Sequence, residues 1–324
     1  MRALICSAFA SLDDVRFGEL PTPTPGPGEV LVRVAAAGVN FYDTLIVQGK
    51  YQIKPPLPFS PGGESAGVVA AVGAGVTRVR PGDRVVAFSH YGAFAEYCLA
   101  PERQTFPLPE GVSFDQAAAA LVAYGTAWFA LYDRGRMRPG ETVLVLGAAG
   151  GVGLAAVQIA HRAGARVIAA ASSPEKLALC AAAGADLCID YSQGELKALF
   201  KQSVGPKGAD IVIDVVGNPY SEAALRAMGW RGRLMIIGFA AGEIPRLPAN
   251  LMLLKGCEVS GVLWDGLLAE DPEPARQQVA DLLAAIADGS LQPRITETFP
   301  LESGLAALKT LAERRVTGKV IVCP

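Results

Sequence analysis

The spacing of hydrophobic and polar positions changes about a third of the way along this chain. Before residue 115, short runs of β-branched and aromatic residues are bounded by Gly or Pro, a pattern typical of strands. These runs predict strands at residues 30–34, 65–72, 84–88 and 93–99. The first third is therefore expected to be rich in β structure.

From residue 115 onward, apolar runs alternate with segments of helical periodicity. The predicted strands are residues 142–146, 166–171, 187–190, 210–216, 233–238 and 258–263, and the predicted helices are 115–130, 152–163, 174–183, 195–204 and 221–228. Such alternation indicates βαβ units and a parallel sheet. The predicted strands are almost wholly apolar, as expected when both faces of a sheet are covered.

The pattern changes again after residue 264. Helices are predicted at residues 274–287 and 301–315, and a last strand at 317–322. Because this tail is too short to form a domain alone, we expect it to return to the first domain. The predicted organisation is one discontinuous domain of residues 1–122 and 265–324, and a second domain of residues 123–264.

A glycine-rich loop, GAAGGVG, follows the strand predicted at residues 142–146. It departs from the usual G-x-G-x-x-G fingerprint at its middle position. A glycine at the strand exit allows a tight turn, a second lets the backbone approach a pyrophosphate, and a third lets the helix pack on the sheet. Amides at the helix start would then face the negative charge. The expected dinucleotide-binding residues are Gly147, Ala149, Gly150, Gly151, Val152 and Gly153.

The residue that ends the second strand of such a unit distinguishes the two nicotinamide cofactors. NAD enzymes usually place an acid there, about 20 residues after the fingerprint, to bind the ribose hydroxyl. This chain has Ala171 at that position, followed by Ser172 and, on the next helix, Lys176. A hydroxyl and an ammonium can bind a 2′-phosphate, although Ser172 could be only loop polarity and Lys176 a solvated helix residue. The missing acid favours NADPH over NADH.

Five short motifs occur in order along the chain: AAGVNFYD at residues 36–43, PGGESAGVV at 61–69, PGDRV at 81–85, YGTA at 124–127 and AAGGVG at 148–153. Together they resemble the quinone oxidoreductase group, which includes zeta-crystallin, of the medium-chain dehydrogenase/reductase superfamily. The resemblance covers essentially the whole chain. It implies an α/β protein with a Rossmann-type parallel-sheet cofactor domain and a GroES-like β-rich catalytic domain, with the active site in the cleft between them.

The same resemblance raises the question of zinc. The superfamily's zinc alcohol dehydrogenases place a Cys where this chain has Asn40, and a His where Gly63 precedes Glu64. A catalytic zinc needs about three protein ligands, and the two histidines, His90 and His161, are isolated. The quartet of closely spaced cysteines that holds structural zinc is missing too. We therefore predict no metal site, and alcohol dehydrogenation is disfavoured because no Lewis acid would assist it.

An enzyme without a metal needs an acceptor that is already electrophilic, such as a quinone or an α,β-unsaturated carbonyl compound. The resemblance implies that Asn40 and Tyr51 lie beside the nicotinamide, where an amide and a phenol could donate hydrogen bonds to the developing oxyanion. Tyr42 is a further candidate for the pocket. Asn40 could instead be a strand-end cap, and Tyr51 an aromatic that packs on a turn near Pro55.

Further cofactor contacts follow from the resemblance, from the adenosine phosphate to the nicotinamide ring. They are Tyr191 near the 2′-phosphate, Thr126 at the nicotinamide ribose, Gly217, Gly238 and Phe239 along the ring, and Lys319 near the C-terminus. Two of these have a simpler interpretation, since Thr126 could cap a helix and Lys319 could be a turn residue.

Three functions remain open on the sequence. The first is NADPH-dependent reduction of quinones. The second is NADPH-dependent reduction of enoyl thioesters or alkenals, and the third is an NADPH-binding structural or sensor protein with little turnover. Turnover with a quinone, with a crotonyl thioester or with no acceptor would separate them.

Charge and hydropathy restrict the partners and the location. The formal net charge is -2 and no long basic run occurs, so nucleic acid is not an expected partner. Apolar stretches are interrupted before the roughly 18 residues that a membrane span needs, and the N-terminus lacks signal-peptide features, so a cytoplasmic location is expected. An exposed last strand at residues 256–264 would be prone to aggregation, so we predict that it pairs with its twin in a homodimer.

Overall fold

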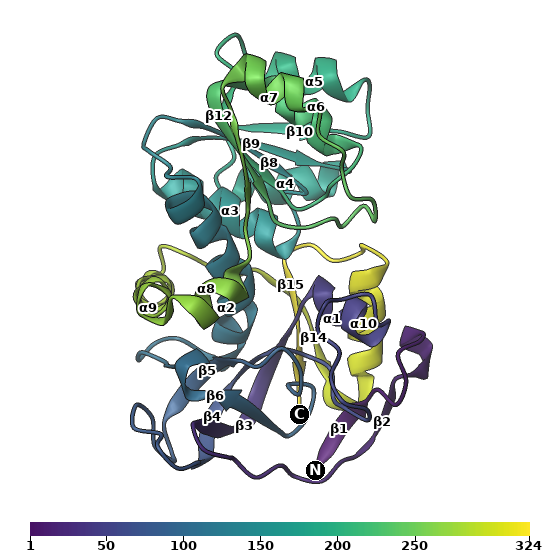
Figure 1. Cartoon of the computed structure of the whole chain (residues 1–324), viewed down its shortest axis with the longest axis vertical. Helices are drawn as coiled ribbons and strands as arrows, with labels where there is room; N and C mark the ends of the chain where they lie inside the picture. Colours follow the sequence, from purple (N-terminus) through teal and green to yellow (C-terminus); the bar gives the residue numbers. More distant parts are fainter. The chain divides into compact units, whose positions relative to one another are not determined.

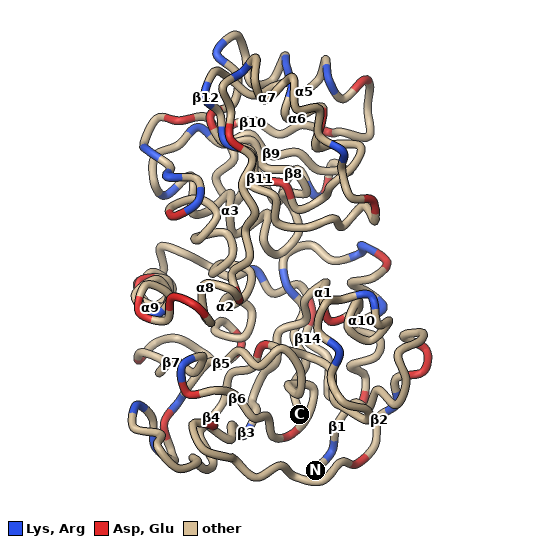
Figure 2. Tube along the Cα trace, viewed as in Figure 1, with Lys and Arg blue, Asp and Glu red and all other residues tan.

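The computed structural model describes residues 1–324, which divide into two compact units (Figure 1). The first unit contains Met1–Val122 and Gly266–Pro324, and the second contains Ala123–Asp265. Charged residues of both signs occur in each unit (Figure 2). None of the helices has the length and apolar character needed to cross a membrane.

The second unit is built on a six-stranded parallel sheet with the order β10-β9-β8-β11-β12-β13. Its strands are β8 (Thr142–Leu146), β9 (Arg166–Ala171), β10 (Leu187–Asp190), β11 (Ala209–Asp214), β12 (Met228–Ile236) and β13 (Glu258–Gly261). Its helices are α3 (Gly151–Arg162), α4 (Pro174–Ala182), α5 (Leu196–Val204), α6 (Tyr220–Ala227) and α7 (Ala249–Lys255). The last four residues of the central strand β8 are wholly buried, as expected where both faces of a parallel sheet are covered. The predicted Rossmann-type sheet is confirmed.

The first unit is built on a seven-stranded sheet in which β14-β15-β3-β4-β5-β7 lie in order and β6 also pairs with β3. Its strands are β3 (Glu29–Val39), β4 (Glu64–Val72), β5 (Arg84–Phe88), β6 (Tyr97–Pro101), β7 (Thr105–Pro107), β14 (Ile295–Pro300) and β15 (Lys319–Cys323), beside a separate pair of β1 (Arg2–Ile5) and β2 (Arg16–Glu19). Its helices are α1 (Phe41–Val47), α9 (Pro272–Ala287) and α10 (Gly304–Ala312). Two further helices, α2 (Phe114–Trp128) and α8 (Trp264–Glu270), run from one unit's residues into the other's.

The C-terminal strand ties the tail of the chain to the first unit. β15 pairs antiparallel with β3, with Val320 opposite Val39 and Val322 opposite Ala37. Alternate residues of β15 enter the same core as β3, because side chains alternate across a strand. The chain after residue 265 therefore returns to the fold of its first third.

Short elements account for most differences from the sequence-based expectation. The helices α1, α7 and α8 and the strand β14 were not predicted, since each has only six or seven residues and shows little periodicity. The helix expected at residues 115–130 ends at Trp128 and continues as a π-helical segment, Phe129–Arg134. The strand expected at residues 93–99 begins only at Tyr97.

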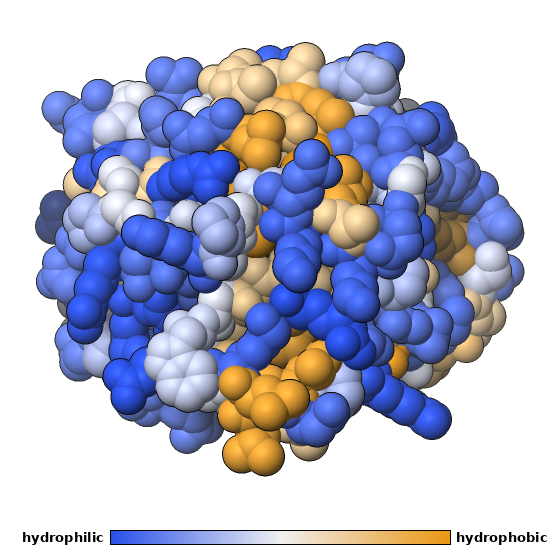
Figure 3. Space-filling model, turned by 90° about the horizontal axis from the view of Figure 1, so that it is seen from above, coloured by the Kyte–Doolittle hydropathy of each residue, from blue (hydrophilic) through white to orange (hydrophobic).

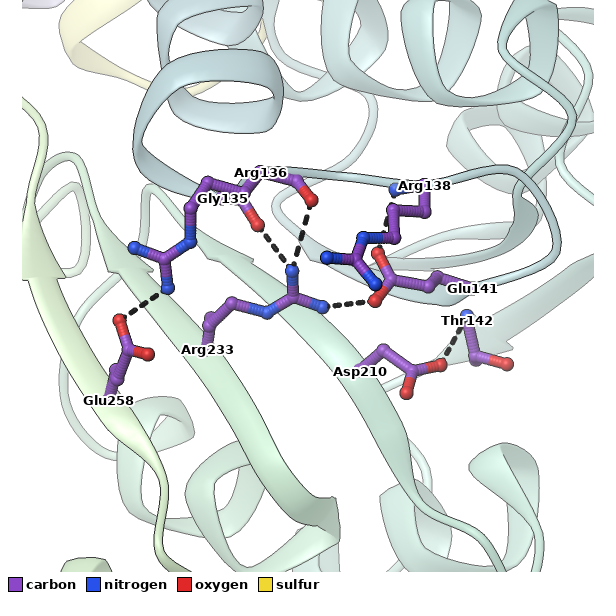
Figure 4. Close-up of polar contacts among 8 residues, drawn as sticks. All are labelled: Gly135, Arg136, Arg138, Glu141, Thr142, Asp210, Arg233 and Glu258. Carbon is purple, nitrogen blue, oxygen red and sulfur yellow. Dashed lines mark hydrogen bonds and ion pairs between the residues drawn. The ribbon is translucent and has the colours of Figure 1, made fainter.

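A buried arginine holds the turn between the π-helical segment and β8 (Figure 4). Arg233 of β12 donates through Nη1 to the carbonyl oxygens of Gly135, at 2.5 Å, and Arg136, at 3.3 Å. Its Nη2 pairs with Glu141 at 2.5 Å, while Arg136 pairs with Glu258 on β13 at 2.6 Å. Because Arg233 is only 8% exposed, these bonds replace hydration that the guanidinium lost on folding. These contacts of Arg233 and Arg136, here called the clamp, thus join the turn before β8 to strands β12 and β13.

Replacing Arg233 with Met should lower the free energy of unfolding by about 2 kcal/mol, because the buried carbonyl of Gly135, the partly buried carbonyl of Arg136 and Glu141 lose their donor. Calorimetric or urea unfolding of the variant measures the loss. The matched control is Arg226→Met, which removes a partly exposed ion pair with Glu222 on α6 and should lower the free energy of unfolding by less than about 1 kcal/mol. A loss for Arg233→Met no larger than the control would contradict the clamp.

Candidate functional site

The glycine-rich loop connects β8 to α3, and two of its glycines are required by packing. Gly147 has φ +63°, and a Cβ there would lie 2.8 Å from a methyl carbon of Val216. A Cβ on Gly153 would lie 2.3 Å from the carbonyl oxygen of Gly147 and 2.8 Å from the Cα of Ala148. Both contacts are closer than real Cβ atoms approach, and the contacts of Gly153 are to backbone, which cannot rotate away. The first turn of α3 therefore lies directly on the end of β8.

Gly150, the N-cap residue of α3, differs from these two glycines. A Cβ at this position would meet only the carbonyl oxygen of Gly147, at an ordinary 3.5 Å. The first turn of α3, which begins with Gly151 and Val152, holds no acidic side chain, and no side chain caps its N–H groups. Ala149 is nearly buried beside it. Free N–H groups at the start of a 12-residue helix favour an anion such as a pyrophosphate.

Three candidate phosphate-binding residues lie at the carboxyl end of β9. The backbone N–H of Tyr191 donates to the carbonyl oxygen of Ala171 at 3.0 Å, which brings the end of β10 beside the end of β9. The Nζ atom of Lys176 lies 3.3 Å from the hydroxyl of Ser172. Asp190, the acid at this edge, accepts the backbone N–H and the hydroxyl of Ser192. The structure therefore brings the Ser172 hydroxyl and the Lys176 ammonium together, with the backbone of Tyr191 beside the end of β9, a strand end that carries no acid.

The cap of α4 positions this group. The Ser173 hydroxyl accepts the backbone N–H of Lys176, and Pro174 occupies the first turn. The ring of Tyr191 packs on the ring of Tyr220, with 4.7 Å between centroids and 52° between planes. An aromatic pair of this tilted kind restrains the direction of the Tyr191 side chain.

A buried carboxylate, Asp214, shapes the loop after β11. It accepts the backbone N–H groups of Val216 and Gly217 at 2.9 Å each, and the Ser221 hydroxyl at 2.5 Å. Gly217 has φ +87°, and a Cβ there would lie 3.2 Å from the ring of Phe239. Sequence analysis did not single out Asp214, although an acid that ends an apolar strand is a detectable signal.

The loops after β8, β11 and β12 thus meet at the carboxyl edge of the parallel sheet, where such sheets bind ligands. The N–H of Gly238 lies 3.4 Å from the carbonyl oxygen of Asp214, so Gly217, Gly238 and Phe239 lie close together. Thr126 lies in α2 and is 8% exposed. The cofactor contacts expected for Thr126, Gly217, Gly238 and Phe239 stay predictions.

A buried polar network occupies the end of β3 in the first unit. The Nδ2 of Asn40 donates to Oε2 of Glu64 at 2.8 Å, and the Oδ1 of Asn40 accepts from Lys319 at 2.6 Å. Lys319 also donates to Glu64 Oε2 and to the Val39 carbonyl oxygen, each at 3.1 Å. Asn40 is 8%, Lys319 4% and Glu64 0% exposed. All three hydrogen bonds of the Lys319 side chain lie within the first unit, and its expected contact with a cofactor stays a prediction.

Asp43 completes this network from the first turn of α1. Its Oδ2 accepts the backbone N–H of Asn40 at 2.7 Å. Complete burial raises the pKa of Asp43 to about 8, and the negative charge of Glu64 adds to the rise, while the Asn40 N–H and Lys319 oppose it. Burial therefore disfavours the charged form of Asp43. Beside it, Lys319 and Glu64 form a buried ion pair at 3.1 Å.

Two tyrosines stack beside this network. The rings of Tyr42 and Tyr51 lie 5.6 Å apart with 29° between their planes, and Tyr42 packs edge-on against Phe88 at 6.4 Å. A Cβ on Gly63 would lie 2.3 Å from the Tyr42 hydroxyl, so this position admits no side chain unless Tyr42 moves. The three expected acceptor-site residues, Asn40, Tyr42 and Tyr51, all lie in or beside α1. Their catalytic roles stay a prediction.

The structure contains no group of three or more His, Cys, Asp or Glu residues arranged to hold a metal ion. Around Glu64, the neighbours are an amide and an ammonium, and neither an ammonium nor a glycine at position 63 can bind a cation. His90 instead packs on Phe88, with 4.7 Å between ring centroids. The residues present do not fit a zinc site.

Comparison with known proteins agrees with these features. Residues 26–110 match the family model for an alcohol dehydrogenase GroES-like domain, and residues 151–285 match that for a zinc-binding dehydrogenase. Quinone oxidoreductase-like protein 2 of Rattus norvegicus is 41% identical over 322 residues, which cover 99% of this chain and 91% of that protein.

Two solved structures are similar over the full length. The mycobacterial protein Rv1454c complexed with NADPH is 34% identical with a TM-score of 0.93, and all of each chain is covered. Escherichia coli quinone oxidoreductase complexed with NADPH is 29% identical with a TM-score of 0.93, again over all of each chain. Each structure therefore has the same two-part fold as this chain.

Proposed function

Because this chain belongs to the quinone oxidoreductase family of the medium-chain dehydrogenase/reductase superfamily, we propose that it reduces quinones with NADPH and without a metal. The observation that carries this proposal is the network at the end of β3. It offers an amide and neighbouring phenols but no metal ligand set. Such a site suits an acceptor that is electrophilic without a Lewis acid.

The carboxyl edge of the parallel sheet fits NADPH. The open approach to Gly150 and the uncapped N-terminus of α3 suit the pyrophosphate. Ser172, Lys176 and Tyr191 would bind the 2′-phosphate, and Gly217, Gly238 and Phe239 would line the nicotinamide. NADPH supplies the hydride when it is bound. The two related structures that hold NADPH support this assignment.

Replacing Lys176 with Ala should raise the KM for NADPH about tenfold, because a charge-assisted hydrogen bond to the 2′-phosphate is lost. The KM for NADH should change less than twofold, since NADH has no 2′-phosphate. Steady-state oxidation at 340 nm measures both constants. The control is Lys197→Ala on α5, an exposed lysine next to the Glu195 cap, which should change neither constant. An equal rise for both cofactors would argue against a phosphate contact.

The residues of the first unit would act on the acceptor. As hydride reaches a conjugated carbon, negative charge develops on the acceptor oxygen, and a positioned N–H or O–H lowers the barrier. Glu64 accepts a hydrogen bond from one N–H of the Asn40 amide. The other N–H of this amide has only a long 3.4 Å contact with the Gly38 carbonyl oxygen. That second N–H and the phenol of Tyr51 are the proposed donors. Asn40 is 8% exposed, so little water reaches its amide, whereas Tyr51 is half-buried.

Turnover in metal-free buffer tests the proposal. We expect NADPH oxidation with 1,2- or 1,4-quinones, unaffected by a chelator. Tyr51→Phe should lower kcat about tenfold if the phenol is a donor, whereas Tyr97→Phe on β6 should not change it. Turnover with only a crotonyl thioester or an alkenal would show that the protein is an enoyl or alkenal reductase instead. NADPH binding with no turnover on any acceptor would favour a structural or sensor role.

A homodimer through β13 is the second proposal. β13 pairs only with β12, so one edge of the parallel sheet has unpaired backbone groups, and such edges are normally covered. Large apolar side chains are exposed on both strands of this edge: Leu263, at 56%, follows β13, and Trp230, at 70%, lies in the neighbouring strand β12. Viewed from above, hydrophobic residues gather in patches among hydrophilic ones (Figure 3). Light scattering should give twice the 33.7 kDa of one chain, and a monomer would contradict the proposal. A cytoplasmic location also stays a prediction.

A further inference from the structure

The proposed function gives no role to the buried cation of the first unit. We propose that Lys319 is the positioning residue of the Asn40 amide: with Glu64 it determines which way the amide faces. This role replaces the cofactor contact that the resemblance implies for Lys319, because the lysine would act through the amide and touch neither the acceptor nor the cofactor. Only the consequence for turnover rests on the proposed function, since the positioning can be measured without any acceptor.

Opposite charges on the two sides of Asn40 make the amide orientation unique. The ammonium of Lys319 lies 2.6 Å from Oδ1, and the carboxylate of Glu64 lies 2.8 Å from Nδ2. Turning the amide over would place its NH₂ group against three ammonium protons and its oxygen against a carboxylate. The second N–H of Nδ2 is thereby held in one direction.

The fold fixes both charged groups. Lys319 is the first residue of β15, and Val320 pairs with Val39, so the ammonium reaches the last carbonyl of β3. Glu64 is anchored by the backbone N–H of Val122 at 2.8 Å from its other oxygen. A Cβ on Gly38 would lie 2.4 Å from Glu64 Oε2, so this glycine admits the carboxylate to the strand end. A pair that only balanced charge would not require both groups to contact the same amide.

The decisive variant is the double substitution Lys319→Met with Glu64→Gln, which removes both charges together. The glutamine side chain introduced at position 64 can still accept the Val122 N–H with its oxygen, and its NH₂ group would then face Asn40. The Asn40 amide should turn over to offer Oδ1 to that group. The matched control is Lys309→Met, which removes a half-exposed lysine of α10 that pairs with Asp13.

The first readout is the side-chain amide signal of Asn40 in the ¹H–¹⁵N NMR spectrum of the deuterated full chain, identified by its loss in Asn40→Ser. In the wild type, we expect two distinct and unequally protected protons. Two protons that exchange equally fast would overturn the inference without any variant. In the folded double variant, the signal should move, and in Lys309→Met it should not. A double variant with the wild-type Asn40 signal would also overturn it.

The second readout is steady-state turnover of the same proteins with a 1,2-quinone. We expect kcat to fall about tenfold in the double variant, with the KM for NADPH within twofold of the wild type. A lower kcat that accompanies a moved signal supports positioning for catalysis. A moved signal with unchanged kcat would leave Lys319 as the positioning residue and remove Asn40 from the proposed function.

Discussion

Replacing Lys319 with Met alone is expected to lower the free energy of unfolding by about 3 to 5 kcal/mol, because Glu64 is left buried without its cation. Glu64 is wholly buried, and Asn40 and the Val122 N–H cannot neutralise its charge. Asp43 gives no compensation, since a second carboxyl beside Glu64 adds repulsion whenever it ionises.

Scanning calorimetry and urea unfolding measure this loss. Because the chain has two units, separate transitions are possible, and the loss should appear in the transition of the first unit. Lys309→Met should cost less than about 1 kcal/mol, since its ion pair with Asp13 is exposed. The double substitution with Glu64→Gln should recover much of the stability. If Lys319→Met unfolds at the same denaturant concentration as the control, Glu64 has another partner.

Replacing Gly153 with Ala is expected to lower the free energy of unfolding by about 3 kcal/mol, because the added methyl group would overlap backbone atoms. The same substitution should abolish most cofactor binding. The carbonyl of Gly147 and the Cα of Ala148 belong to the turn that leaves β8, so the start of α3 must move away from the sheet. Such a movement displaces the N–H groups that would bind the pyrophosphate.

Gly150→Ala supplies the comparison for this prediction. Its methyl group meets only one atom, at an ordinary distance, so the free energy of unfolding should change by less than about 1 kcal/mol. Affinity for NADPH should nevertheless fall, because the methyl group would occupy the approach of the pyrophosphate. Titration of NADPH fluorescence and thermal unfolding separate the two effects. If Gly150→Ala and Gly153→Ala lose equal stability, Gly150 is a packing residue. If Gly150→Ala binds NADPH as tightly as the wild type, the pyrophosphate does not bind at Gly150.

The sequence alone predicted several strands of both sheets closely. The strands at residues 84–88, 142–146, 166–171 and 187–190 have the same bounds in the structure, since each is a short apolar or β-branched run between turn signals. Helix α1 was missed because its seven residues hold little periodicity, yet it begins directly after Asn40 and carries Asp43.

For the candidate site, the sequence determined the residue types at each loop: the glycines of residues 147–153, the strand end without an acid at Ala171, and the missing zinc ligands. These are local properties, because each depends on neighbouring residues or on one side chain. Only the tertiary structure decided that Lys319 contacts Asn40 and Glu64, which lie 279 and 255 residues away in the chain. That contact depends on the pairing of β15 with β3, and no local pattern encodes the register between strands from opposite ends of the chain.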